Sequence, residues 1–222
     1  MVRGRLLPES SKGATGSELM FTGIVQGIAK VSENVIGAGG SKLVLEFPAS
    51  AMDGASPGMS IAIDGVCLTV VEVSGRASSF DVVGETIART TLGECVAGGY
   101  VNYERAAKYG GEIGGHEMSG HISTTAEIIE ISNPDGNHVL TLEVAPEWMR
   151  YILAKGFIGL DGASLTVATV NPAGNFTVWL IPETLARTCF SQRQVGDIIN
   201  VEIDAKTQAI VETVEKYMEA RE

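Results

Sequence analysis

Apolar residues along this chain fall into short runs that alternate with polar positions, which is the period of a half-buried β-strand. From about residue 20 to residue 204, clusters of Gly, Asn, Pro or Ser interrupt these runs about every 8–15 residues. The clearest turn sequences stand at residues 74–75, 133–136 and 171–174. The pattern predicts strands at residues 24–31, 41–47, 60–63, 67–73, 78–83, 100–105, 120–131, 139–144, 158–160, 164–170, 176–181 and 198–203.

Helical spacing is confined to a few segments. Short helical pieces are predicted at residues 48–52, 85–92 and 146–153. A longer amphipathic helix is predicted at the C-terminal residues 206–222. Its apolar positions recur three or four residues apart, at Ile210, Val211, Val214, Tyr217 and Met218. Because a short isolated helix is marginal in water, this apolar stripe needs another apolar surface to lie against.

The chain repeats itself at a distance of 97 or 98 residues. Four blocks return in the same order: residues 22–25 as 119–122, 64–70 as 161–167, 85–90 as 183–188, and 101–104 as 199–202. We therefore predict an all-β protein of two copies of one unit, followed by the C-terminal helix. A unit of about six short strands is expected to close into a barrel, because closure removes exposed edges. A duplicated unit also implies a duplicated site for two similar ligands.

These observations divide the chain into four parts. Residues 1–19 are polar and aperiodic and lack the apolar core of a secretory signal, so we expect a disordered leader or an expression remnant. The first barrel is expected at residues 20–116 and the second at residues 117–205. The helix at residues 206–222 completes the chain.

Composition narrows the class of protein. Hydrophobic residues make up 45% of 222 residues, enough for a packed core. The net charge of −11 argues against nucleic-acid binding, because the chain would repel phosphates. No apolar run approaches the ~18 residues that cross a bilayer. Three widely spaced cysteines do not make a disulfide framework, so the prediction is a cytoplasmic protein.

Matched positions of the repeat carry the candidate chemistry. Alternation places Cys67 and Thr69 on one face of a strand, and it does the same for Ser164 and Thr166. From the residues alone, these four could equally be ordinary inward residues of a small barrel. His116 and His121 are five apart, on opposite faces of a strand, which argues against a shared metal. The glycine pairs at residues 110–111 and 114–115 do not link a strand to a long helix, so a dinucleotide site is excluded.

Long motifs resemble one known family. The segments MFTGIV, DGVCLTV, ETIARTTL, VNYERAAKYGGEIGGHEMSGHI, KGFIGLDGASLTV and LIPETLARTCF closely resemble riboflavin synthases of the alpha-chain type. The resemblance runs from residue 20 to about residue 218. It implies two six-stranded Greek-key barrels and a homotrimer gathered around the C-terminal helices, with the productive site between barrels of neighbouring subunits.

The reaction that this resemblance implies is a dismutation of 6,7-dimethyl-8-ribityllumazine. One lumazine donates four carbons to another, giving riboflavin and 5-amino-6-(D-ribitylamino)uracil without a cofactor or metal. The family also implies a functional link to lumazine synthase. A non-catalytic antenna protein that carries a lumazine or flavin is the alternative. A flavin reductase is excluded, because no residues remain to build a nicotinamide-binding domain.

The resemblance also assigns residues. Those implied to be catalytic are Cys67, His121, Thr69, Phe21, Ser164, Thr166 and Asp204. Those implied to contact substrate, besides Cys67, Thr69, His121, Ser164 and Thr166, are Gly23, Ile24, Val25, Leu68, Asp81, Val82, Val83, Gly84, Glu85, Thr86, Gly120, Ile122, Lys155, Leu165, Ile181, Pro182, Glu183, Thr184, Leu185 and Ala186.

Some of these assignments have plainer alternatives. Phe21 could be a core residue, and Lys155 could be a solvated surface charge. Asp204 could cap the last helix. For His116, a structural role is the favoured interpretation. Cys67 could act as a weak acid, a base or a nucleophile only if its thiolate is accessible.

Overall fold

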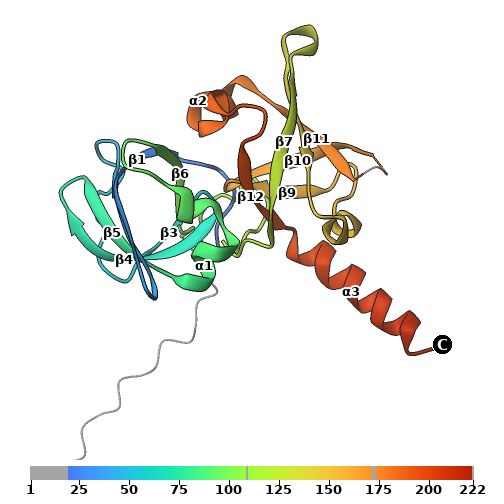
Figure 1. The fold of residues 1–222 in the computed structure, drawn as a ribbon, viewed down its shortest axis with the longest axis horizontal. Helices are drawn as coiled ribbons and strands as arrows, with labels where there is room; N and C mark the ends of the chain where they lie inside the picture. Colours follow the sequence, from blue (N-terminus) through green and yellow to red (C-terminus); the bar gives the residue numbers. More distant parts are fainter. Residues whose placement is uncertain (1–19, 109, 172–173, 222) are drawn as a thin grey trace, which may run out of the picture.

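The computed structural model describes residues 20–108, 110–171 and 174–221, and it shows two closed antiparallel barrels followed by a helix (Figure 1). The predicted pair of six-stranded barrels is therefore confirmed. The first barrel contains β1 (Gly27–Gly37), β2 (Gly40–Glu46), β3 (Ser60–Ile63), β4 (Val66–Ser74), β5 (Ala77–Val83) and β6 (Tyr100–Arg105). The second contains β7 (Thr124–Ser132), β8 (His138–Glu143), β9 (Phe157–Leu160), β10 (Ala163–Asn171), β11 (Asn175–Leu180) and β12 (Ile198–Ile203).

Both barrels have the same topology. The strand order is β1-β2-β5-β4-β3-β6 in the first, and the equivalent strands follow each other in the same order in the second. Even the irregularities repeat. β4 has a register shift between Val70 and Glu72, and β10 has one between Val167 and Thr169, at the matched positions. Such bulges increase strand twist and bend the sheet, as closure of a small barrel requires.

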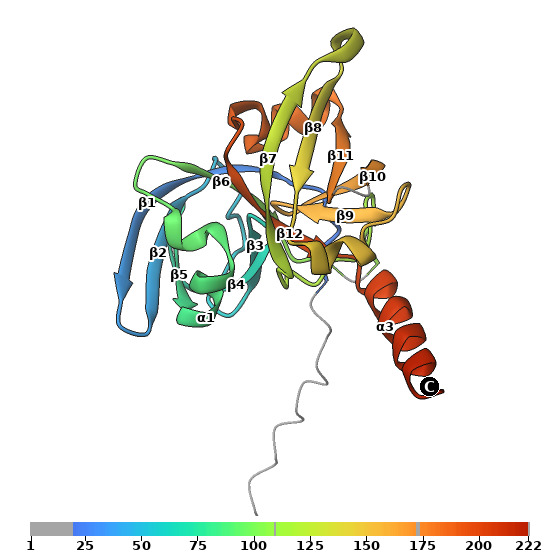
Figure 2. The same ribbon diagram turned by 45° about the vertical axis from the view of Figure 1, so that its right-hand side comes forward.

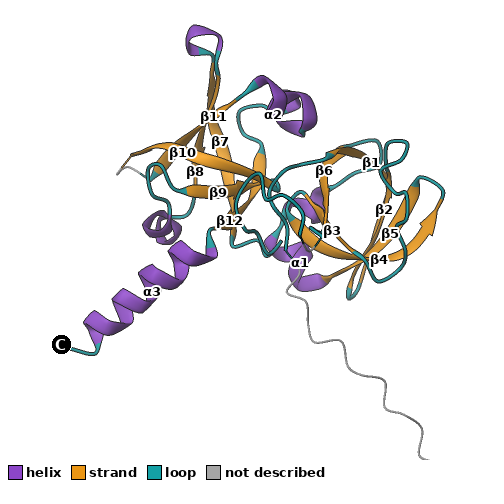
Figure 3. Cartoon of the chain, turned by 180° about the vertical axis from the view of Figure 1, so that it is seen from behind, coloured by secondary structure: helices purple, strands orange, loops and turns teal. Residues whose placement is uncertain are grey.

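Helices are few and short, apart from the last one (Figure 3). The α-helices are α1 (Gly84–Arg89), α2 (Pro182–Arg187) and α3 (Ala205–Glu219). The 3-10 turns are η1 (Thr91–Glu94), η2 (Pro134–Gly136), η3 (Pro146–Tyr151) and η4 (Cys189–Gln192).

Several predicted elements need correction. The helix predicted at residues 48–52 is a series of turns, and the one at residues 146–153 is the 3-10 turn η3. The strands predicted from residues 24 and 120 begin later, at Gly27 and Thr124. Sequence analysis missed α2, although its ETLAR repeats the ETIAR of α1.

The inside of each barrel is filled by side chains. In β4, Val66, Leu68 and Val70 are buried, whereas the alternate residues Cys67 and Thr69 face outward. The matched strand β10 has the same pattern. The alternative that the Cys-x-Thr and Ser-x-Thr residues point into the barrels is therefore wrong. The apolar residues between and beside them fill the barrel cores instead. A ligand of these pairs would bind on the outer surface of a barrel.

The barrels meet around two abutting hairpin turns. Asp64-Gly65 joins β3 to β4, and Asp161-Gly162 joins β9 to β10; all four residues have positive φ. A Cβ on Gly65 would lie 2.8 Å from the backbone nitrogen of Gly162, so only glycine allows this approach.

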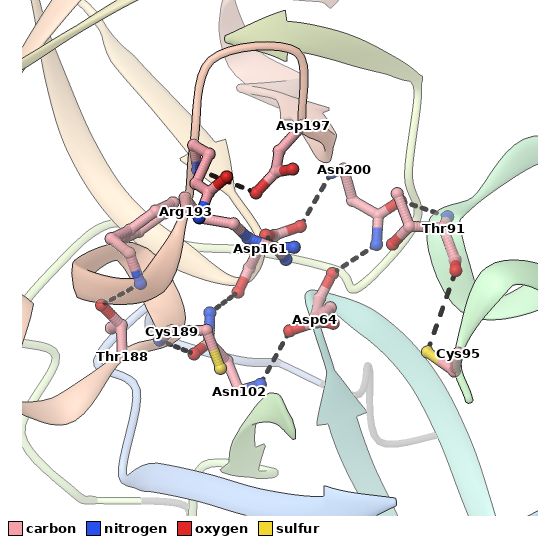
Figure 4. A network of polar contacts seen from close by, with 12 residues as sticks. Asp64, Thr91, Cys95, Asn102, Asp161, Thr188, Cys189, Arg193, Asp197 and Asn200 are labelled. Carbon is pink, nitrogen blue, oxygen red and sulfur yellow. Dashed lines mark hydrogen bonds and ion pairs between the residues drawn. The ribbon is translucent and has the colours of Figure 1, made fainter. Parts of the chain in front are cut away.

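Two buried asparagines tie the barrels together beside these turns (Figure 4). The Asn102 amide nitrogen donates to the Asp161 carbonyl, and that of Asn200 donates to the Asp64 carbonyl, each over 2.9 Å. The Asn102 oxygen accepts from the Cys189 backbone amide at 2.8 Å. The matched Asn200 oxygen accepts from Thr91 at 2.9 Å. Each asparagine side chain thus makes two hydrogen bonds to the backbone of the opposite barrel.

Helix α3 projects from the second barrel into open space (Figures 1 and 2). The Asp204 carboxylate accepts from the Thr207 backbone amide at 2.9 Å, which is the capping role considered above. Arg150 of η3 forms an exposed ion pair with Glu215 of the helix at 3.1 Å. Of its apolar positions, Val211 packs against the second barrel. Those left largely exposed are Ile210, Val214, Tyr217 and Met218. None of the described helices is long and apolar enough to span a bilayer.

Candidate active site

Two connecting segments are exchanged between the barrels. The segment at residues 21–25 precedes the first barrel, yet the Gly23 carbonyl accepts from the Ser164 amide of the second at 2.8 Å. Reciprocally, the Gly120 carbonyl accepts from the Cys67 amide of the first barrel at 2.9 Å. Cys67 and Thr69 of the first barrel are therefore bordered by the segment that leads into the second barrel. Ser164 and Thr166 of the second barrel are bordered by the segment that leads into the first.

Buried glutamates hold these segments in place. Glu104 accepts from the Thr22 amide at 2.7 Å and from the Gly23 amide at 2.9 Å. Glu202 accepts from the backbone amides of Ser119 at 2.6 Å and Gly120 at 3.1 Å. Burial raises the pKa of both carboxyls, while the amide hydrogen bonds oppose that rise by favouring the ionised form.

The two exchanged glycines cannot carry a side chain. Gly23 has φ +71°, and a Cβ there would lie 2.4 Å from the Ser164 Cβ. Gly120 has φ +78°, and its Cβ would lie 2.6 Å from the Cys67 Cβ. The backbone of each exchanged segment therefore lies directly against a candidate residue, Ser164 or Cys67.

The first face consists of Cys67 and Thr69 on β4 together with residues 120–122. Thr69 and His121 are exposed, and Cys67 is partly buried. His121 lies before β7 rather than on a strand. The prediction that His116 and His121 lie on opposite faces of one strand is therefore wrong. Burial raises the pKa of the Cys67 thiol, so it is protonated at neutral pH. Cys67 can therefore bond a ligand but is not a ready thiolate nucleophile.

The second face consists of Ser164 and Thr166 on β10 together with residues 23–25. The Ser164 hydroxyl lies 2.7 Å from Nδ1 of His116. The His116 ring stacks on Phe157 with centroids 5.1 Å apart. Burial lowers the pKa of His116, which favours its neutral imidazole, and that ring can donate a hydrogen bond to the hydroxyl or accept one from it.

A helix-turn segment follows the strand next to each face. Because β4 and β5 run antiparallel, residues 81–86 pass alongside the Cys67 end of β4. Residues 181–186 pass in the same way along the Ser164 end of β10. Val83 and Ile181, at matched positions, are 62% and 63% exposed, so an apolar side chain faces solvent beside each face.

The other predicted site residues are placed as follows. Phe21 is buried against Ala62 and Met118, which agrees with its alternative as a core residue. Lys155 is exposed in the turn before β9. Residues whose side chains point into barrel cores, and so offer only backbone outward, are Val25, Leu68, Val82 and Leu165. No group of three His, Cys, Asp or Glu side chains suited to a metal occurs in the part of the chain that the structure describes.

Comparison with known proteins decides the family. A model described as the lumazine binding domain matches residues 22–106 and 119–204. A riboflavin synthase of Escherichia coli (strain K12) is 49% identical over 204 residues, covering 91% of this chain and 95% of that protein. A riboflavin synthase of Buchnera aphidicola subsp. Schizaphis graminum (strain Sg) is 42% identical over 200 residues. The match covers 90% of this chain and 96% of that protein. The chain belongs to the riboflavin synthase family.

Solved structures share the fold. LumP complexed with 6,7-dimethyl-8-(1'-D-ribityl) lumazine matches with a TM-score of 0.75 at 22% identity, covering 83% of this chain and 99% of that one. LumP complexed with riboflavin matches with a TM-score of 0.77 at 23% identity. At this identity the likeness shows the fold alone.

Both faces of this riboflavin synthase family member are open within one chain. A cavity of about 550 Å³ between the barrels is lined by neither Cys67 nor Ser164. A ligand-binding pocket normally buries most of its ligand.

Sequence analysis did not assign His116 and Phe157 to the site. His116 was interpreted as structural, whereas its ring bonds Ser164 and stacks on Phe157. No spacing rule signals this contact, because it depends on residues 116–122 passing between the barrels.

Proposed function

We propose that the duplicated, chemically unequal faces bind two molecules of 6,7-dimethyl-8-ribityllumazine, one on each barrel. The chain is a transferase with riboflavin synthase activity: four carbons pass from one lumazine to the other, giving riboflavin and 5-amino-6-(D-ribitylamino)uracil. The observation that carries this proposal is the matched pair of faces. Each has an outward hydroxyl or thiol pair on a strand and a glycine carbonyl supplied by an exchanged segment.

The faces differ where donor and acceptor roles require a difference. Cys67 corresponds in the repeat to Ser164, and His121 corresponds to Ile24. The exposed His121 imidazole is suited to take the proton that leaves the lumazine 7-methyl group. Ser164, bonded to neutral His116, offers a hydroxyl that hydrogen-bonds the ring on the other side. Thr69 and Thr166 add a hydroxyl beside each of these groups.

We further propose that a neighbouring subunit covers each open face. The apolar stripe Ile210, Val214, Tyr217 and Met218 is exposed on α3 and supports assembly of a homotrimer around this helix. In that arrangement the first face of one subunit meets the second face of the next, so that the two lumazines lie together. Asp204 and Lys155 border the second face in this proposal.

The remaining expectations stand as proposals of the same kind. The lumazine-binding units are residues 20–116 and 117–205, and the assembly helix is residues 206–222. We place the enzyme in the cytoplasm, with a functional link to lumazine synthase. Residues 1–19, for which a disordered leader was expected, lie outside the described residues.

Incubation with ribityllumazine alone tests the reaction. Two lumazines should disappear for each riboflavin and each pyrimidinedione formed, and chelators should have no effect. Replacement of Cys67 or His121 should lower kcat more than it weakens binding, whereas Ser164→Ala should mainly alter binding. Binding without turnover would instead identify an antenna-type carrier, and a product ratio far from one to one would contradict dismutation.

A further inference from the structure

The Ser164 side chain is enclosed by the segment that passes between the barrels. A Cβ on Gly115 would lie 2.9 Å from the Ser164 hydroxyl oxygen, so the backbone there packs directly against this side chain. His116, the next residue, places its Nδ1 2.7 Å from the same oxygen. Within the described residues, the one hydrogen bond of the Ser164 hydroxyl is therefore to an imidazole.

The first barrel supports its matched residue in another way. Burial raises the pKa of Cys67, and a hydrogen bond from Ser60 on β3 opposes part of that rise. The repeat places Phe157 of β9 at the position of Ser60. A phenyl ring cannot hydrogen-bond Ser164, and it instead stacks on His116, with the ring centroids 5.1 Å apart and the planes 13° apart. The second face thus has an imidazole, held by an aromatic ring, where the first has a hydroxyl.

The other ring nitrogen of His116 has no partner. His116 is only 7% exposed, and its Nε2 is buried without a hydrogen bond in the part of the chain that the structure describes. Burial lowers the pKa of His116, and the charge of Asp204 opposes this shift only in part, so the ring is neutral at about pH 8. The Asp204 carboxylate accepts from Thr207, through its amide at 2.9 Å and its hydroxyl at 2.6 Å.

A neutral imidazole carries one proton, and its two placements leave different groups buried. With the proton on Nε2, a buried N–H lacks an acceptor, and the Ser164 hydrogen is directed at Nδ1. With the proton on Nδ1, that N–H donates to the Ser164 oxygen, and only the Nε2 lone pair lacks a partner. Buried N–H groups without an acceptor are rarer in proteins than acceptors without a donor. The second placement therefore agrees with the burial of Nε2.

We propose that His116 is a positioning residue, which donates from Nδ1 to Ser164 and so makes the Ser164 hydroxyl a hydrogen-bond donor toward the ligand. The inference rests on the proposed function and deepens it, because it states which kind of ligand atom this hydroxyl recognises. That atom is an acceptor, either a carbonyl oxygen or an unprotonated nitrogen of the lumazine ring. A ring N–H is disfavoured at the same place, since two donors would then face each other.

The position of the proton can be measured directly on the full-length protein. The chain has three histidines, so ¹⁵N labelling of histidine alone gives few signals, and the His116→Asn variant identifies those of His116. At about pH 8, the Nδ1 signal of His116 should have the chemical shift of a protonated nitrogen and the Nε2 signal that of an unprotonated one. A proton that resides mainly on Nε2 would overturn the proposal.

Variants of His116 separate positioning from a merely structural role. The amide of His116→Asn places an N–H donor where Nδ1 lies, whereas that of His116→Gln lies farther out, and His116→Leu has no donor. The Leu and Gln variants should raise KM for ribityllumazine about fivefold to tenfold with less change in kcat, while Asn stays within about twofold of the parent protein. His138→Asn, at a histidine outside both faces, is the matched control and should change neither constant.

A double variant tests whether His116 acts through Ser164. Once Ser164→Ala has removed the hydroxyl, adding His116→Leu should raise KM no further. Additive effects of the two substitutions, or an Asn variant as impaired as the Leu variant, would refute the positioning role. A parent protein that does not convert ribityllumazine would contradict the proposed function instead, and the proton measurement on His116 would still stand by itself.

Discussion

The asparagine pair that ties the barrels together offers a direct test of how the interface is stabilised. Asn200 is fully buried, and its side chain makes two hydrogen bonds to the opposite barrel, with Asp64 and Thr91. Asn200→Ala leaves a backbone carbonyl and a backbone amide buried without partners. Since each such group costs about 1–3 kcal/mol, the variant should lose about 2–6 kcal/mol of unfolding free energy.

Equilibrium unfolding in urea, followed by two probes, measures this loss. Both tryptophans, Trp148 and Trp179, belong to the second half of the chain, so fluorescence reports that half. Far-ultraviolet circular dichroism reports both barrels. Because the lost bonds join the barrels, the two transitions should separate in the variant if they coincide in the parent protein.

Two controls bracket the result. Asn102→Ala removes the matched pair of bonds, to Asp161 and Cys189, and should cost a similar amount. Asn137→Ala removes one bond at an exposed turn and should change stability by less than about 0.5 kcal/mol. A loss below about 1 kcal/mol for Asn200→Ala would refute the claim that these bonds stabilise the interface.

Three further perturbations test other features. Asp64→Asn should stabilise the protein at neutral pH, because burial raises the folded-state pKa of Asp64 above its unfolded value and so penalises the ionised form. This gain in unfolding free energy should fade as pH drops below the raised pKa toward about 4. Urea titrations at several pH values measure it, and a gain that does not change with pH would contradict this cause. Gly23→Ala should cost about 1–3 kcal/mol more than Gly54→Ala, because both glycines have similar positive φ but only Gly23 meets a neighbour; equal thermal shifts would exclude the steric effect. Val214→Asp should leave the barrels folded yet abolish the proposed trimer, and sedimentation of an unchanged trimer would show that α3 does not assemble it.

The barrels could be predicted because the information for them is local and repeated. Alternation and turn residues locate all twelve strands, and the repeat shows that they form two equal units. The repeat also contained α2, since ETLAR at residues 183–187 copies ETIAR at residues 85–89, and this signal was overlooked.

The exchanged segments could not be predicted in this way. Residues 24–26 and 120–123 have strand-like sequences, so the strands were expected to begin there. Their backbone instead hydrogen-bonds residues far along the chain, as the Gly120 carbonyl does with the Cys67 amide. Contacts of this separation depend on how the barrels pack, which alternation does not encode. The same holds for the contact between His116 and Ser164.

The two halves of the chain are matched at some positions of the fold and differ at others. The residues that maintain the fold are matched: the Asp-Gly turns, the two asparagines and the two glutamates that hold the exchanged segments. The halves differ within the cores, as with Phe80 against Val178, and they also differ at the candidate faces, with Cys67 against Ser164. A symmetric scaffold places two groups in equivalent positions, and substitution of one then changes its chemistry without moving it. In the proposed function, the exchange of Cys67 for Ser164 gives two identical substrates unequal surroundings.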